Sequence, residues 1–332
     1  MDTAIDPVTA YLETFERLRA AKRWTTNAMV FRFVALTLGA AGADVTYDRL
    51  EAAAQGLKKR ARWTSPLKSE IRYVVAAMIL RRGLDPARIH ARVVETRDAF
   101  KTHKIASRGS GPTLAALLLV LQGEGRAVPR RQLERFAQIY RRWRDDHFWL
   151  TDANDLPAAA LHASRDEPVE VLAANVERAY QSLRDAGFSR GDQLQLVSQL
   201  LAVDPRGTDV GVQRFCRVTA RLKDARERVN ASHYDEVAML ALTQEAPARV
   251  VDRVLRYRDR LRAAKRPPSK DLAFSLAAGI TLAEDSKRAE ARSAGDLAAL
   301  QAIRAILDAQ QAVMVATITA STASSSAAAG SG

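Results

Sequence analysis

Polar side chains are concentrated in one short stretch, residues 145–157, where their types would suit metal binding or acid–base chemistry. The candidate residues of this hairpin are Asp145, Asp146, His147, Asp152 and Asp155. Carboxylates bind divalent cations, and a carboxylate near a histidine can transfer protons. The alternative interpretation is structural, with Asp145 and Asp146 balancing the preceding arginines and Asp152 or Asn154 capping the next helix. We favour the structural interpretation, so the sequence predicts no catalytic residue, no metal and no cofactor.

The other residues that commonly support catalysis or nucleotide binding are scattered along the chain. The five histidines do not show the paired spacing of a zinc-binding helix. Cys216 is the single cysteine, which excludes a disulfide framework, and we expect it to be a small buried residue. The glycine-rich segments 109–112 and 123–125 fall between predicted helices and follow no strand, so a phosphate-binding loop is not expected.

A second kind of candidate site is electrostatic. The formal net charge is +13, and residues 1–150 carry 27 basic and 15 acidic side chains, against 24 and 23 in residues 151–332. The candidate residues for an anionic partner are Lys58, Lys59, Arg60, Lys101, Lys104, Arg141, Arg142 and Arg144. A positive surface attracts phosphate-rich or acidic partners, whereas the same bases at helix ends would simply interact favourably with the helix dipole. A smaller basic cluster lies at 253–266.

The elements that position these residues are predicted to be helices, because alternating strand patterns are almost absent. Apolar residues recur at helical spacing along most of the chain, and prolines mark several helix starts. The predicted fold is therefore all-α, with about fourteen helices arranged as stacked antiparallel hairpins.

A repeat of about 40 residues organises these helices. The large apolar residues near the end of every second helix are Leu18, Leu57, Phe100, Trp143, Leu183, Leu222 and Leu261. Each is followed by a base, and an aromatic often lies five or six residues further on, as at Trp24, Trp63, Trp149 and Phe188. We interpret these aromatics as packing residues of the hairpin junctions. One hairpin cannot bury its apolar face alone, so about seven should stack as an open α-solenoid or as a compact array.

The chain is predicted to divide into a helical-repeat domain, residues 7–285, and a C-terminal appendage, residues 286–332. Residues 294–316 read as one helix, and the following residues form a small, uncharged, Ala- and Ser-rich tail. We expect the apolar part of the appendage to pack into the groove of the repeat domain. The alternatives are pairing with a second copy or contact with a lipid surface.

The same sequence favours a cytoplasmic protein. It contains no run of 18 or more apolar residues that could span a bilayer, and its first residues lack the apolar region of a signal peptide.

Three further segments resemble a bacterial family known only as domain of unknown function family 4003. They are the run His147–Thr151 with Asp155 and Pro157, the run Gly187–Gly191, and the run Leu200–Pro205. The end of the chain, from Ala309 onward, is similar as well. The resemblance implies a helical bacterial protein but supplies no activity, cofactor or catalytic residue.

Together these patterns predict binding rather than catalysis. The leading hypothesis is a non-enzymatic binding or scaffold protein that presents a helical-repeat surface to a macromolecular partner, a protein rather than a nucleic acid. The first alternative is a nucleic-acid binder that holds the phosphate backbone through the basic N-terminal half. The second is an enzyme or metal site in the 145–157 hairpin.

Overall fold

The computed structural model describes residues 6–21, 28–39, 45–63, 65–105, 110–146, 153 and 155–292. This part of the chain contains fourteen α-helices, two short 3-10 helices and no strand, which confirms the predicted all-α fold. The first eight α-helices are α1 (Pro7–Ala21), α2 (Ala28–Gly39), α3 (Tyr47–Arg60), α4 (Ile71–Arg81), α5 (Pro86–Thr102), α6 (Ser110–Gln122), α7 (Arg130–Asp146) and α8 (Leu156–His162). The remaining six are α9 (Val169–Asp185), α10 (Asp192–Leu201), α11 (Thr208–Asp224), α12 (Tyr234–Ala241), α13 (Pro247–Arg262) and α14 (Lys270–Arg292). The 3-10 helices are η1 (Pro66–Lys68) and η2 (Ala231–His233).

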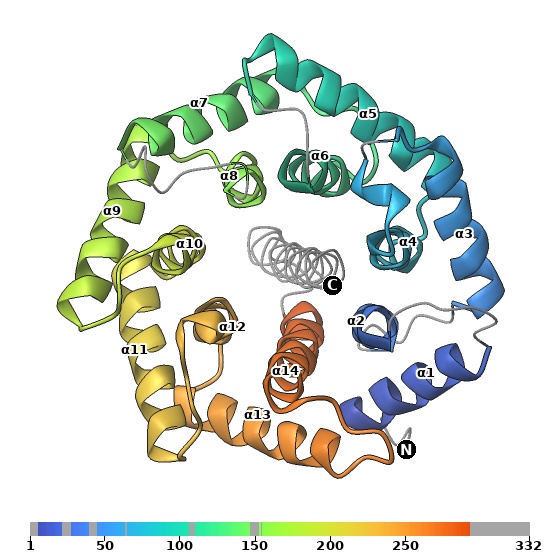
Figure 1. Cartoon of the computed structure of the whole chain (residues 1–332). Helices are drawn as coiled ribbons and strands as arrows, with labels where there is room; N and C mark the ends of the chain where they lie inside the picture. The colour runs from blue at the N-terminus through green and yellow to red at the C-terminus, as the bar shows by residue number, and fades with distance from the viewer. Residues whose placement is uncertain are drawn as a thin grey trace, which may run out of the picture.

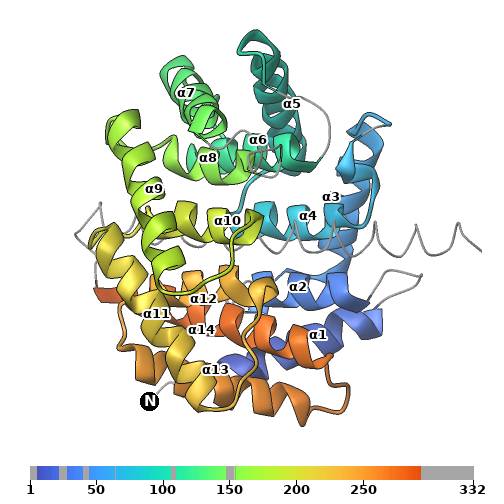
Figure 2. The same cartoon turned by 60° about the vertical axis from the view of Figure 1, so that its left-hand side comes forward.

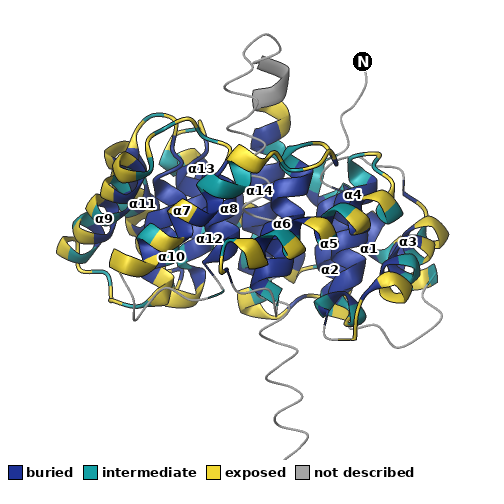
Figure 3. Ribbon diagram, turned by 90° about the horizontal axis from the view of Figure 1, so that it is seen from above, coloured by how far each residue is buried: buried dark blue, intermediate teal, exposed yellow. Residues whose placement is uncertain are grey.

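The helices form two concentric layers (Figure 1), with the odd-numbered helices outside and the even-numbered helices inside. The outer helix α7 is amphipathic, because Phe136, Tyr140 and Trp143 are buried on one face while arginines occupy the other. The inner helix α6 is instead buried continuously from Gly111 to Leu121. Figure 3 shows the same contrast between buried inner helices and outer helices with exposed faces. A helix that is apolar all round requires neighbours on every side, so this pattern assigns each helix to its layer.

The two layers close into a ring. The last helices, α13 and α14, lie beside the first two, α1 and α2, as Figures 1 and 2 both show. A polar contact joins the two ends, because the Nη2 atom of Arg32 donates to the backbone oxygen of Arg266 at 2.8 Å. Of the two predicted alternatives, the described residues thus form a closed array rather than an open superhelix.

The inner helices run parallel, as contacts between their ends show. Near their amino ends, Ser275 Oγ of α14 donates to Glu236 Oε1 of α12 at 2.5 Å. Near their carboxyl ends, Gln122 Nε2 of α6 donates to the Ala160 oxygen of α8 at 3.2 Å. We call the side where the inner helices begin the amide pole, and the side where they end the carbonyl pole. The outer helices lie lengthwise around the perimeter of the ring, across the inner helices (Figure 1). The end of one outer helix therefore lies near the start of the next, as where Arg142 of α7 pairs with Glu170 of α9.

The seven apolar residues chosen from the sequence all lie near the ends of outer helices. Each of them, from Leu18 to Leu261, is at most 3% exposed. The base that follows each one therefore lies near the end of an outer helix. The 40-residue spacing in the sequence corresponds to one outer and one inner helix in the ring.

The predicted boundary at residue 285 falls inside α14, which continues to Arg292. The predicted helix at 294–316 and the Ala- and Ser-rich tail lie outside the described residues, so the division into two parts stays a prediction. Among the helices described, none combines the length and apolar character needed to cross a membrane.

Candidate functional site

The predicted basic residues lie at the ends of three successive outer helices, α3, α5 and α7 (Figure 1). Lys58, Lys59 and Arg60 lie in the last turn of α3, and Lys101 lies in the last turn of α5. Lys104 follows α5, and the three arginines 141, 142 and 144 lie in the last two turns of α7. All eight thus lie at the carboxyl ends of outer helices, where a cation interacts favourably with the helix dipole.

Only some of these cations are available to a partner. Lys101 Nζ pairs with Asp98 Oδ1 at 2.5 Å, and Arg142 is held between Asp146 and Glu170. The others have weaker local engagements: Arg60 Nη1 donates to the Gly56 oxygen at 3.2 Å and Arg141 Nε to the Ala137 oxygen at 3.1 Å. The exposed side chains of Lys58, Lys59, Lys104 and Arg144 form no ion pair within the described part of the chain. The surface role predicted from the sequence stays a prediction, and it concerns chiefly Lys58, Lys59, Lys104 and Arg144.

Ring closure brings the late basic cluster next to the first helix of the chain, where Arg266 pairs with Glu16. Arg262 at the end of α13 and Lys265 in the next connection are exposed, and neither has an ion-pair partner among the residues described. Their connection lies next to α1, and α3 follows α1 around the ring (Figure 1). We call the set Lys58, Lys59, Arg60, Arg62, Lys68, Arg262 and Lys265 the basic arc. The sequence separates its two halves by nearly 200 residues.

The exposure of one aromatic side chain next to the basic arc differs from the sequence prediction. Trp63, expected to pack at a hairpin junction, is 90% exposed on the connection between α3 and η1. Phe188 does pack as expected, with its ring centroid 5.0 Å from that of Phe215, whereas Trp24 and Trp149 lie outside the described residues. The available signal was local composition, since Trp63 follows four cations within six residues and no apolar neighbour covers it.

The polar hairpin at 145–157 does not assemble as one site in the described residues. Asp145 and Asp146 are exposed, and Asp146 pairs with Arg142, as the structural interpretation predicted. Asp155 is only 7% exposed, and its Oδ1 atom accepts hydrogen bonds from Gln199 Nε2 at 2.9 Å and Gln195 Nε2 at 3.4 Å. His147 and Asp152 lie outside the described residues. Asp155 thus points into a junction with α10 and away from the surface pair.

A histidine that the sequence left unassigned lies near this junction. His162 is fully buried at the end of α8, and its ring meets that of Trp143 edge-on at 5.4 Å between centroids. Its Nε2 atom lies 2.9 Å from the backbone oxygen of Gln199. Since a carbonyl oxygen only accepts hydrogen bonds, Nε2 carries the proton. Burial lowers the pKa of His162 to about 3. The imidazole is therefore neutral at ordinary pH and serves as a donor that joins two inner helices.

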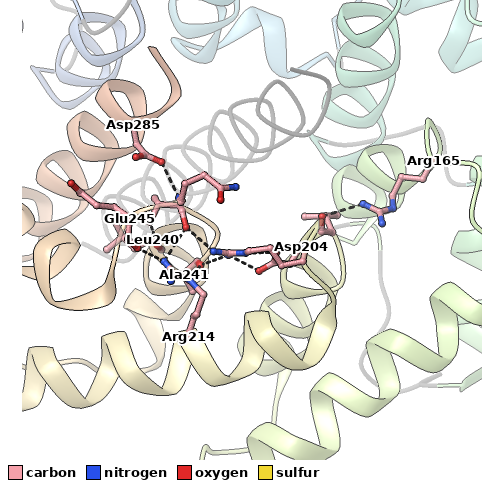
Figure 4. Close-up of polar contacts among 11 residues, drawn as sticks. Arg165, Asp204, Arg214, Leu240, Ala241, Glu245 and Asp285 are labelled. Atoms are coloured by element: carbon pink, nitrogen blue, oxygen red, sulfur yellow. Dashed lines mark hydrogen bonds and ion pairs between the residues drawn. The ribbon is translucent and has the colours of Figure 1, made fainter. Parts of the chain in front are cut away.

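The segment Leu200–Pro205, which carries part of the family resemblance, leads into a second network at the carbonyl pole (Figure 4). The buried Asp204 carboxylate pairs with the Arg206 guanidinium, with Oδ2–Nη2 at 2.7 Å and Oδ1–Nε at 2.9 Å. Arg206 also donates to the backbone oxygens of Thr243 at 3.0 Å and Ala241 at 2.9 Å. Arg214 of α11 donates to the same two carbonyls, at 2.9 Å and 2.8 Å.

This network extends across neighbouring hairpins. Arg165 follows α8, and its Nη1 atom donates to the backbone oxygen of Val203 at 3.1 Å (Figure 4). The Oδ2 atom of Asp285 in α14 accepts from the backbone N–H of Gln244 at 3.3 Å. Carbonyls after an inner helix have no partner within that helix, so the neighbouring hairpin supplies one. The conspicuous polar residues of this segment therefore cap and connect helices, and nothing in their geometry requires a substrate.

A third buried cluster joins α12 and α14. Burial, and next the neighbouring Asp235 carboxylate, raise the pKa of Glu236 well above its ordinary value. Ser275 donates to Glu236, and the His233 ring packs edge-on against Phe274 at 5.2 Å between centroids. No three His, Cys, Asp or Glu side chains in the described ranges are placed to hold a metal ion. Local sequence patterns do not reveal this cluster, because its members come from η2, α12 and α14.

These features define a closed, two-layered α-helical ring with exposed cations at the ends of its outer helices. The chain belongs to a family described as "Protein of unknown function (DUF4003)", whose model matches residues 14–312. It is similar to the uncharacterized protein YeaA of Bacillus subtilis (strain 168), with 24% identity over 213 residues. That alignment covers 64% of this chain and 63% of YeaA. No solved structure matches the chain.

Proposed function

We propose that the protein is a cytoplasmic, non-enzymatic binding protein that contacts an acidic macromolecular partner through the basic arc and Trp63. The observation that carries this proposal is the position of Trp63, 90% exposed among cations that have few or no acidic partners. Tryptophan and arginine dominate the binding energy of many protein interfaces, and electrostatic complementarity accelerates association. A large exposed aromatic side chain lowers solubility, so we attribute the exposure of Trp63 to contact with a partner.

The ring geometry favours a protein partner over a nucleic acid held in a groove. A helical-repeat protein that grips a phosphate backbone needs a basic concave face. Here the inner layer is apolar, as α4 and α6 illustrate, and the cations lie at the ends of the outer helices. The remaining nucleic-acid alternative is contact through the basic arc, with a nucleobase stacked on Trp63.

The enzymatic alternative at 145–157 gains no support from its described members. Asp146 is engaged by Arg142, and Asp155 by Gln199 and Gln195. A general base needs to reach a substrate proton, whereas Asp155 is buried within a helix junction.

The test is a comparison of variants as bait in a native bacterial lysate. One variant combines Lys58→Ser, Lys59→Ser and Arg60→Ser, and a second carries Trp63→Ala. The matched control combines Arg126→Ser, Arg130→Ser and Arg131→Ser, which removes the same charge from exposed positions near the carbonyl pole. We expect a protein partner to be recovered with the wild type and the control and lost with both arc variants, more steeply so as salt rises.

Fluorescence anisotropy with labelled duplex DNA and single-stranded RNA tests the alternative partner class. Binding that weakens steeply with salt and disappears with both arc variants would replace the protein partner by a nucleic acid. Equal recovery of every partner by the arc variants and the carbonyl-pole control would contradict the proposed surface altogether.

A further inference from the structure

A groove lies between two successive outer helices, α3 and α5, and one end of it is formed by Arg60 of the basic arc. Its volume is about 490 Å³, within the roughly 300–1,000 Å³ of typical ligand sites. One side is lined by α3, and the other by residues of the segment 80–87, which ends α4 and begins α5. The groove thus opens directly beside the surface proposed to contact the partner.

The side of α3 that faces the groove has small residues between two cations. The α3 residues that line it are Arg49, Ala52, Ala53, Gly56 and Arg60. This spacing places them on one face of the helix, with the two arginines three turns, or about 16 Å, apart. Both arginines are exposed, and neither forms an ion pair within the described part of the chain. A phosphate ion is far smaller than this separation, whereas an extended peptide covers it with about five residues.

Gly56 keeps the groove open beside Arg60. Glycine is unfavourable in the interior of a helix, yet Gly56 lies inside α3. A Cβ atom at this position would lie 3.2 Å from Nη1 of Arg60, which folds back and donates to the Gly56 oxygen at 3.2 Å. The missing side chain therefore leaves room for the Arg60 guanidinium and for a ligand backbone to approach α3.

The groove favours an acidic ligand. Among its lining residues, Asp85 is the one acid, against the two arginines of α3. The Oδ1 atom of Asp85 accepts from the backbone N–H of Arg88 at 2.6 Å, so this carboxylate already caps α5. The amino end of α5 adds to the positive potential. A basic segment would be repelled here, and an acidic one attracted.

We propose that the groove between α3 and α5 binds an extended acidic segment of the protein partner, with carboxylates near Arg49 and Arg60. Trp63 follows Arg60 by three residues, so it lies within about 11 Å of this end of the groove, and the bound segment continues toward it. The inference rests on the proposed function, because the basic arc receives one end of the segment. It adds Arg49, which the arc does not include, and it names the chemistry of the ligand.

Single-cysteine labelling locates a bound acidic segment on the full-length chain. The probe is a decaglutamate peptide at low salt, in a Cys216→Ser background because Cys216 is the single native cysteine. The reporters are Ala52→Cys in the groove, Ser69→Cys beside Lys68 of the basic arc, and the control Ser189→Cys after α9, all at exposed positions. With peptide at about ten times its Kd, maleimide labelling of Ala52→Cys should slow by roughly five- to tenfold, because the free site is depleted by that factor. The control rate should not change.

Two substitutions test the groove without altering the basic arc. Ala52→Leu inserts a larger side chain with no change of charge, and Arg49→Gln removes one cation. We expect Arg49→Gln to raise the Kd of the labelled peptide by roughly two- to fivefold, the range of an exposed ion pair. Ala52→Leu should raise it further, because it obstructs the whole segment. The matched control Arg88→Gln removes an equal charge from an exposed arginine that does not line the groove.

The possible outcomes separate this inference from the proposed function. Slower labelling at Ser69→Cys alone, with both groove variants binding like the control, would overturn the groove and leave the basic arc as the partner surface. Protection of neither reporter would overturn both. Protection of Ala52→Cys by single-stranded RNA but not by decaglutamate would mean that the groove takes a nucleic acid, which overturns the acidic peptide.

Discussion

Asp6 at the start of α1 and Arg260 near the end of α13 form an ion pair across 254 residues, with Oδ1 and Nη1 2.6 Å apart. A second ion pair, further along α1, joins Glu16 Oε2 and Arg266 Nη1, which are 3.3 Å apart. Consecutive hairpins are held together by short connections, but the first and last hairpins have no such connection. These polar contacts, with the apolar packing of α13 and α14 against α1 and α2, are what close the ring.

The Asp6–Arg260 pair gives ring closure a dependence on pH. The hydrogen bond from Arg260 lowers the pKa of Asp6 from its ordinary value of 3.8 to about 2. The stabilising contribution is therefore complete above pH 3.8 and is lost as the pH falls toward 2. Both side chains are about two-fifths exposed, so we expect a contribution of only about 0.5–1 kcal/mol. Asp6→Asn should reduce the free energy of unfolding in urea at pH 6 by this amount and make no difference near pH 2. Equal destabilisation at both pH values would contradict this assignment.

The Asp204–Arg206 pair predicts a much larger effect, because its carboxylate side chain is fully buried. Arg206→Met would leave that carboxylate and the Thr243 and Ala241 carbonyls with fewer donors. We expect the free energy of unfolding to fall by about 3–5 kcal/mol, as for other buried pairs that lose one partner. The control is Arg190→Met, on an exposed arginine, which should change stability by less than about 0.5 kcal/mol. Urea denaturation compares the two, and a similar small loss for both would show that Arg214 alone suffices.

The all-α fold and the layer of each helix were predictable, because periodicity and apolar content are local properties. The continuous apolar run of α6 and the one-sided pattern of α7 already distinguish an inner from an outer helix. Closure of the ring was not predictable from such patterns. It depends on small angles that accumulate over seven hairpins, and on contacts such as Arg260 with Asp6 that no local pattern reveals.

The candidate surface was predictable in part. Lys58, Lys59 and Lys104 are exposed, since a base at the end of an outer helix has little to pack against, while their role as a partner surface stays a prediction. The pairing of Arg142 with Glu170 was not visible, because the two residues are 28 positions apart on different helices. The prediction for Trp63 is wrong because spacing alone did not distinguish it from Phe188: they lie six and five residues past Leu57 and Leu183. The connection after α3 leads into a 3-10 turn and leaves the indole in solvent.

The exposure of Trp63 itself can be tested without a partner. Trp63→Ala should change the free energy of unfolding by less than about 0.5 kcal/mol, since the side chain covers no core surface. Trp143→Ala, at a residue only 3% exposed, should cost about 3–5 kcal/mol. Iodide quenching gives the second readout, because Trp63→Ala should remove one iodide-accessible component of the wild-type emission. A large loss of stability in Trp63→Ala would mean that the indole packs against the protein after all.

His162 predicts how the whole ring responds to mild acid. Burial is the main cause of its lowered pKa of about 3, against an ordinary value of 6.5. Between these values the unfolded chain binds a proton that the folded chain excludes, so stability rises with pH and is complete above about 6.5. At pH 5 this one group should contribute a slope of about 1.4 kcal/mol per pH unit. His162→Gln keeps a donor for the Gln199 oxygen and cannot titrate, so its unfolding free energy should depend less steeply on pH between 4 and 6. His103→Gln, at a partly exposed histidine outside the junction, serves as the control. Parallel pH profiles for wild type and His162→Gln would mean that water or movement of α8 allows His162 to be protonated within the folded ring.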